Sequence, residues 1–125
     1  MKIELPEKYV KEPIDAPYSP VLTIEGKELV LISGTVCDDW EGQMPETIEE
    51  QARCVLKACQ ARLQDAGCDL ENVFNVEVFM ADLAQWGDFN KVYREMMPDP
   101  KPCRRAVQVG LLPGYLVEVV MWAVK

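Results

Sequence analysis

Two arginines, Arg104 and Arg105, stand next to each other where an apolar stretch begins near the C-terminal end of the chain. A guanidinium keeps its charge at any ordinary pH and presents a planar pair of donors that fits a carboxylate. Either arginine could hold a carboxylate ligand at the mouth of a pocket, or both could be solvated charges at the end of a strand. The chain has a formal net charge of −8, so the pair does not belong to a generally basic surface.

The alternation of side chains along a strand separates the two arginines. Arg104 shares its face with Ala106 and Gln108, which is typical of a polar cleft wall. Arg105 shares the other face with Val107, which predicts core, where a charged side chain would have to reach back to solvent. We therefore expect Arg104 to be the arginine that binds a ligand.

The chain contains no histidine, which excludes catalytic triads built on histidine, most zinc sites and a histidine general base. Its 21 acidic residues outnumber 13 basic ones and no run of Lys or Arg occurs, which argues against binding a nucleic-acid backbone. No apolar run approaches the roughly 20 residues of a membrane-spanning helix, and the first residues lack the apolar segment of a signal peptide. The sequence predicts a soluble protein of the cytoplasm.

The cysteines are odd in number and none belongs to a CxxC motif, so we expect reduced thiols that fill the core. They are Cys37, Cys54, Cys59, Cys68 and Cys103. A sharper alternative concerns Cys103, because the two arginines that follow it would favour a reactive thiolate. The sequence offers no partner base for such a thiolate.

Two helices are predicted from the spacing of apolar residues. The clearer one covers residues 47–66, with Thr47 as its N-cap, Glu50 completing a capping box and Gly67 suited to its C-terminal end. The second covers residues 88–97.

Alternation of apolar and polar residues predicts five strands. They cover residues 21–26, 27–34, 72–81, 105–112 and 115–124. The first two are expected to form a hairpin that turns at Gly26, and the Pro-rich residues 1–20 to wrap the surface with little regular structure. The order of elements is β-β-α-β-α-β-β.

The last strand is apolar on both faces. Val117 and Met121 lie on one face, and Val120 and Trp122 on the other, which only Glu118 interrupts. Two helices can cover only one face of a sheet, so the other face needs a further surface, most simply another subunit. The sequence therefore predicts a homo-oligomer.

Six short stretches, in this order and at these spacings, make the chain similar to a known family. They are APYSP (16–20), ISG (32–34), QAR (51–53), VFMADL (78–83), DFNKVY (88–93) and PCRRAVQVGLLP (102–113). They resemble the reactive intermediate deaminase (RidA/YjgF) family, and the likeness covers nearly the whole chain. The resemblance implies one domain over residues 1–125 with a chorismate-mutase-like α+β fold, in which two helices pack on one face of a mixed sheet.

The resemblance also implies an assembly and a reaction. Family members form homotrimers with active sites in clefts between subunits, and they use neither a metal nor an organic cofactor. They hydrolyse reactive enamines or imines to 2-keto acids and ammonia. The partner expected for this chain is therefore a small carboxylate-bearing substrate, and not a membrane or a nucleic acid.

The family's carboxylate-binding arginine occupies a motif similar to P-x-R-x-x-V, which places it at Arg104 as the catalytic residue. The further substrate-binding positions that the resemblance implies are Tyr18, Ser33, Gly34, Asn90, Ala106 and Glu118. Several have a plainer alternative, because the Tyr18 ring could pack on a Pro-rich arm. Likewise, Ser33 could end a strand, and Asn90 could cap a helix or face water.

Two positions depart from the family pattern. Ala106 replaces a cysteine that is common there, and Val120 stands where the main subfamily has the glutamate that orients the attacking water, with Glu118 at the preceding acid. The departures leave two alternatives open: a non-catalytic trimer that binds or senses small carboxylates, and a 2-aminomuconate-type deaminase with a larger substrate. Ribonuclease activity, ascribed to some relatives, is disfavoured by the net charge of −8 and the lack of histidine.

Overall fold

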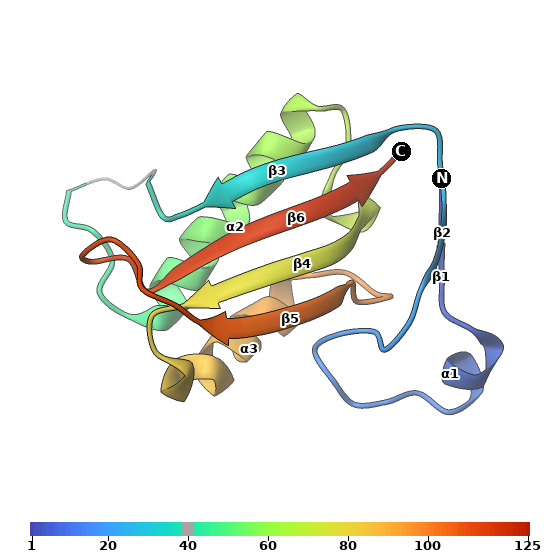
Figure 1. The fold of residues 1–125 in the computed structure, drawn as a ribbon, viewed down its shortest axis with the longest axis horizontal. Helices are drawn as coiled ribbons and strands as arrows, with labels where there is room; N and C mark the ends of the chain where they lie inside the picture. Colours follow the sequence, from blue (N-terminus) through green and yellow to red (C-terminus); the bar gives the residue numbers. More distant parts are fainter. Residues whose placement is uncertain (39–41) are drawn as a thin grey trace.

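A four-stranded mixed sheet with two long helices on one face forms the body of the protein (Figure 1). The computed structural model describes residues 1–38 and 42–125. The strand order is β3-β6-β4-β5, in which β4 and β5 run parallel and the other neighbours antiparallel. These elements are β3 (Leu29–Thr35), α2 (Ile48–Asp65), β4 (Val73–Met80), α3 (Trp86–Met96), β5 (Cys103–Gln108) and β6 (Val117–Val124). The predicted α+β class is confirmed.

Helix α2 begins and ends as its sequence predicts. The Thr47 side chain accepts a hydrogen bond from the backbone N–H of Glu50, and Gly67 follows the helix with a φ of +80° that favours glycine. Helix α3 begins earlier than predicted, at Trp86, because a 3-10 turn over Leu83–Gln85 leads directly into it.

The core lies between the sheet and the helices. The inward residues of β6 are Val117, Val119, Met121 and Ala123, all fully buried, and those of β4 include Val76, Val78 and Met80. Phe89 and Tyr93 of α3 meet the same cluster, and both are completely buried. The two helices therefore cover one face of the sheet only.

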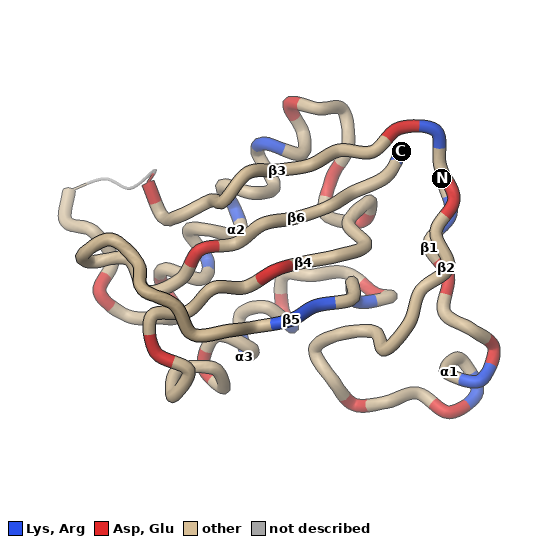
Figure 2. The backbone as a smooth tube through the Cα atoms, viewed as in Figure 1, with Lys and Arg blue, Asp and Glu red and all other residues tan. Residues whose placement is uncertain are grey.

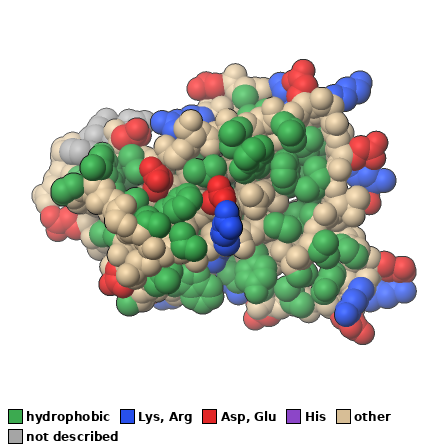
Figure 3. Space-filling view, in the orientation of Figure 1, with side chains coloured by type: hydrophobic (Ala, Val, Ile, Leu, Met, Phe, Trp, Pro, Cys, Tyr) green, Lys and Arg blue, Asp and Glu red, His purple; other side chains and the backbone are tan. Residues whose placement is uncertain are grey.

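The opposite face of the sheet is open and apolar. Leu29 and Leu31 of β3 are 67% and 56% exposed, and Val107 of β5 is 38% exposed. Figure 3 shows hydrophobic side chains gathered over β3 and β6 on this face. The prediction that β6 is apolar on both faces is confirmed, whereas the prediction that Val107 belongs to the core is wrong for a single chain.

The N-terminal residues contain regular structure that the sequence analysis missed. Strand β1 (Lys2–Glu4) pairs with β2 (Thr23–Glu25) as a separate two-stranded sheet, and helix α1 (Glu7–Lys11) lies between them in the chain. The expected hairpin at Gly26 is wrong, since β3 pairs with β6 instead. Gly26 passes close to the end of β6, where an added Cβ would lie 2.3 Å from the Val124 side chain. This close approach explains why residue 26 is a glycine, although no hairpin turns there.

A disulfide joins Cys37, just after β3, to Cys54 in α2, with the two Cα atoms 5.3 Å apart. The prediction that all five thiols are reduced is wrong for this pair, because spacing along the chain does not reveal that the segment after β3 folds back onto α2. Cys59, Cys68 and Cys103 are free. Among the described residues, no helix combines the length and apolar character needed to cross a membrane.

Candidate functional site

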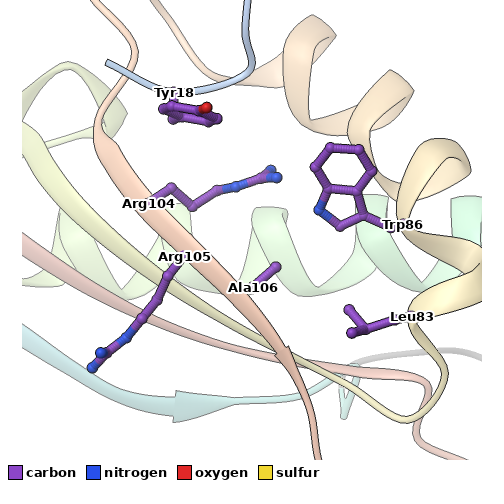
Figure 4. Close-up of a pocket in the computed structure, with 6 residues that line it drawn as sticks. All are labelled: Tyr18, Leu83, Trp86, Arg104, Arg105 and Ala106. Atoms are coloured by element: carbon purple, nitrogen blue, oxygen red, sulfur yellow. The ribbon is translucent and has the colours of Figure 1, made fainter. Parts of the chain in front are cut away.

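The Arg104 side chain extends from the edge strand β5 toward Trp86 (Figure 4), and it meets a cluster of aromatic rings on α3. The guanidinium carbon lies 4.6 Å from the centre of the Tyr93 ring, 5.8 Å from that of Phe89 and 6.0 Å from that of Trp86. Such distances allow cation–π attraction. The cluster holds the cation against the helix and leaves one side of it facing the space between Tyr18 and Trp86.

The aromatic cluster follows from the spacing of one helix. Trp86, Phe89 and Tyr93 stand at positions i, i+3 and i+7 of α3, which places them on one face. The Phe89 and Tyr93 rings have centroids 5.8 Å apart and are fully buried, whereas Trp86 is 42% exposed. The inward positions of Phe89 and Tyr93 were predicted, but the role of Trp86 was not, although the spacing of three aromatic residues is a signal for such a surface.

Arg104 has no carboxylate partner among the described residues. The four other arginines each form an ion pair: Arg53 with Glu95, Arg62 with Asp38, Arg94 with Asp15 and Arg105 with Glu77. The Nη1 atom of Arg104 is buried and has no hydrogen-bond partner in the described structure. Burial lowers the pKa of this guanidinium, because the charged form is less well solvated there than in water. An anionic ligand would supply the missing acceptor.

Arg105 points the other way, onto the open face of the sheet. Its side chain is 74% exposed and donates to Glu77 across a distance of 2.6 Å. The two residues are direct neighbours in the parallel pairing of β5 with β4, where basic and acidic segments lie side by side (Figure 2). The two adjacent arginines thus occupy different environments, one paired in solvent and one unpaired against rings.

A cavity of about 410 Å³ opens in front of Arg104. Its lining consists of Tyr18, Leu83, Trp86, Arg104, Arg105 and Ala106. The segment that carries Tyr18 is fixed to the start of β5, since the backbone N–H of Ser19 donates to the Pro102 carbonyl at 3.1 Å and its hydroxyl donates to the Lys101 carbonyl. Three of the expected site residues, Tyr18, Arg104 and Ala106, therefore line one cavity.

Asn90 of α3 does not line this cavity; it is buried, with a side-chain oxygen that has no hydrogen-bond partner among the described residues. The Tyr93 hydroxyl is likewise buried and unpaired in the described structure, and burial raises its pKa above the ordinary value. Unpaired buried polar groups are rare in proteins and need an explanation such as a missing ligand or water. Of these two residues, Tyr93 contacts the unpaired cation of Arg104 through its ring.

Ser33 and Gly34 lie elsewhere, in β3 at the opposite edge of the sheet, and Glu118 lies in the neighbouring strand β6. The pairing of β3 with β6 is irregular between Ile32 and Thr35, which is where Ser33 and Gly34 occur. An added Cβ on Gly34 would lie 2.9 Å from a carboxylate oxygen of Glu118, so the acid rests against this backbone. Three strand spacings separate β3 from β5, which is roughly 14 Å. One chain therefore holds the expected residues as two separate groups.

Neither a reactive thiolate nor a metal site is supported by the described residues. Burial raises the pKa of the Cys103 thiol, and Cys103 lies on the opposite face of β5 from Arg104. No group of three or more His, Cys, Asp or Glu side chains is placed to hold a metal ion in the described part of the chain.

Residues 10–125 match the family model described as Endoribonuclease L-PSP. A mouse protein named 2-iminobutanoate/2-iminopropanoate deaminase is 36% identical over 112 residues, which cover 87% of this chain and 82% of the mouse protein. A Schizosaccharomyces pombe protein named mmf2, mitochondrial, is 34% identical over 97 residues, covering 78% of this chain and 75% of the yeast protein.

Solved structures agree with the sequence matches. The crystal structure of RidA from the Antarctic bacterium Psychrobacter sp. PAMC 21119 superposes with a TM-score of 0.73 at 31% identity, covering 82% of this chain and 85% of that one. A YjgF family protein from Neisseria meningitidis superposes with a TM-score of 0.71 at 25% identity, covering 100% of this chain and 96% of that one.

Proposed function

The chain belongs to the Endoribonuclease L-PSP (RidA/YjgF) family, and on this premise we propose that it hydrolyses reactive 2-imino acids to 2-keto acids and ammonia, with Arg104 binding the substrate carboxylate. The observation that carries the proposal is the state of Arg104. It is the one arginine of the chain without a carboxylate partner in the described structure, and it faces an open cavity. A substrate carboxylate would complete its hydrogen bonds.

We infer further that the site is assembled between subunits of a homotrimer. Two observations support this: the second group of expected residues lies on β3 and β6, away from β5 in the same sheet, and the open face is apolar. Strands β3 and β5 are both edge strands, which proteins tend to cover or pair. Packing the β5 edge of one subunit near the β3 edge of the next would bring Arg104 and Glu118 into one cleft.

The reaction needs a water molecule to add to an already electrophilic carbon. In the proposed course, the fork of Arg104 fixes the carboxylate and so orients the neighbouring C=N carbon. The water oxygen bonds to that carbon while Glu118 of the adjoining subunit accepts a water proton. Glu118 then returns the proton to the nitrogen, which gives a carbinolamine. The proton of the carbinolamine hydroxyl next passes through Glu118 to the same nitrogen, the C–N bond breaks, and ammonia leaves as the C=O bond forms.

Glu118 is proposed for this step because of its contact with Gly34. The sequence places Val120, and not an acid, where the water-orienting glutamate is expected, so a water would lack a base at that position. The structure has a carboxylate two residues earlier, against the backbone of Gly34. Ser33 and Gly34 would then offer hydroxyl and backbone donors to the same substrate.

The proposal is tested by measuring imine hydrolysis in Arg104→Ala and Arg105→Ala. The imine is generated in place by an L-amino-acid oxidase, and ammonia release is followed in excess of the spontaneous rate. We expect Arg104→Ala to lose roughly 2–5 kcal/mol of transition-state binding, about 30-fold or more in kcat/KM. Arg105→Ala is the matched control, since its side chain is already paired in solvent, and its rate should stay within about twofold.

The opposite pattern, in which Arg105→Ala is inactive and Arg104→Ala is normal, would show that Arg105, and not Arg104, binds the substrate carboxylate. Tight binding of 2-keto acids without any ammonia release would instead favour the non-catalytic carboxylate sensor. Cleavage of RNA that is lost with Arg104→Ala would favour the ribonuclease activity suggested by the family's description.

That the protein is located in the cytoplasm remains a prediction. The Cys37–Cys54 disulfide argues against a cytoplasmic location, because the cytosol keeps most protein thiols reduced.

A further inference from the structure

The cavity in front of Arg104 has a mostly apolar wall that the carboxylate clamp does not use. Trp86 is 42% exposed and Leu83 is 40% exposed, although both are large hydrophobic side chains. They stand beside each other along one side of the cavity, across from β5 (Figure 4). Exposed apolar side chains that line one concave surface are typical of a place where apolar ligand surface is buried.

The wall begins next to the cation. The Trp86 ring centre lies 6.0 Å from the guanidinium carbon of Arg104. In a 2-imino acid, the side chain branches from the carbon that bears both the carboxylate and the nitrogen. With the carboxylate on Arg104, a side chain directed along the wall would therefore reach Trp86 within its first few atoms and Leu83 after that.

The strand side of the cavity leaves room for such a side chain. Ala106 lines the cavity on the same strand face as Arg104 and contributes only a methyl group. A methyl or ethyl side chain on the substrate would leave most of the wall in contact with water. A branched or aromatic side chain would cover it.

We propose that this chain prefers 2-imino acids with a bulky hydrophobic side chain, branched or aromatic, over 2-iminopropanoate and 2-iminobutanoate. The inference rests on the proposed function and names the substrate class of that same site. Trp86 is the main specificity residue, through stacking and burial of apolar surface, and Leu83 extends its wall.

The same wall disfavours a substrate with a second carboxylate, such as a 2-aminomuconate. Of the two cations that line the cavity, Arg105 is paired with Glu77 and only Arg104 lacks a carboxylate in the described structure. A second carboxylate placed along the wall would meet Trp86 and Leu83, where it would lose solvation without gaining a partner.

The test compares imines generated from L-alanine, L-leucine and L-phenylalanine, with semicarbazide to trap the imine that escapes hydrolysis. For wild-type protein, kcat/KM should be about tenfold higher or more for the two large imines than for 2-iminopropanoate, which is within the discrimination that apolar contacts achieve. In Trp86→Ala this ratio should fall about tenfold, whereas Trp86→Phe should keep most of it. Ala106→Leu should also lower the ratio by filling the cavity from the strand side.

The control substitution is Ile24→Ala. Ile24 is an exposed apolar residue of β2 that does not line the cavity, so the ratio of kcat/KM between the large imines and 2-iminopropanoate should not change in this variant. A ratio at or below one in wild type, or a ratio unmoved in Trp86→Ala, would overturn the inference while leaving the proposed function intact. Preference for a dicarboxylic imine would overturn it too. Failure to hydrolyse any imine would instead remove the proposed function.

Discussion

Arg104 is a cation whose Nη1 atom is buried without a hydrogen-bond partner in the described structure. Taking an ion out of water costs several kcal/mol even after the protein relaxes, whereas cation–π contacts return roughly 1–2 kcal/mol. The ligand-free site is therefore expected to destabilise the fold. This balance is typical of residues retained for function and not for stability.

Arg104→Met should make the protein more stable while it abolishes carboxylate binding. A methionine can pack against the rings of Phe89 and Tyr93 without a desolvated charge, and we expect a gain of about 1 kcal/mol in the free energy of unfolding. The measurement is urea unfolding without ligand. Arg105→Met is the control, with a change below roughly 0.5 kcal/mol because its ion pair is exposed. A clear loss of stability in Arg104→Met would show that the cation stabilises the ligand-free fold.

How far the sequence predicts single residues depends on what is close in the chain. Strand alternation separated Arg104 from Arg105, which do point to opposite faces. Alternation predicted the surroundings of the two faces less well. The face of Val107 was predicted to be core and is the open face of the sheet, whereas the face of Arg104 was predicted to be a polar cleft wall and packs against the aromatic rings of α3. Whether Arg104 forms an ion pair depends on which acidic side chains the fold brings near it, and the local sequence pattern does not contain that information.

Among the elements, α2 was predictable because its cap, its apolar face and its terminal glycine are all local signals. The β2–β3 hairpin was predicted wrongly, since the choice of β2 between pairing with β3 and pairing with β1 depends on β1 residues that lie 19 to 23 positions away in the sequence. The segment between β3 and α2 also carried no sign of its tie to the helix, which is the disulfide of Cys37 with Cys54.

Reduction of this disulfide should lower the free energy of unfolding by about 3 kcal/mol, the size expected for a loop of this length. The test is urea unfolding of wild-type protein with and without a dithiol reductant. Cys54→Ala should be less stable than wild type and insensitive to the reductant. Cys68→Ser, which alters a free thiol, should keep the response to reductant. If wild-type stability did not depend on the reductant, the bond would not contribute to folding.

For the whole molecule, the main feature is a sheet with helices on one face and exposed leucines on the other. The sequence predicted this imbalance correctly, because the two apolar faces of β6 can be read from alternation and the helices can be counted. Which strand lies at which edge could not be read in the same way. That order decides that Tyr18, Arg104 and Ala106 are separated from Gly34 and Glu118.

The separation of Arg104 on β5 from Glu118 on β6 has a genetic consequence. If each cleft takes Arg104 from one subunit and Glu118 from the next, two inactive variants should repair each other. Arg104→Ala and Glu118→Gln, unfolded together and refolded at equal amounts, should recover about a quarter of wild-type activity, since that fraction of randomly formed clefts is intact. Native mass spectrometry confirms subunit exchange, and each variant refolded alone is the control.

No recovery after subunit exchange would mean that each site lies within one chain. Recovery would mean that two null alleles of this gene complement each other in one cell. It would also mean that an allele altered at only one of these residues, coexpressed with the normal one, leaves the activity of the normal product unchanged, since each altered subunit still completes a cleft with its other residue.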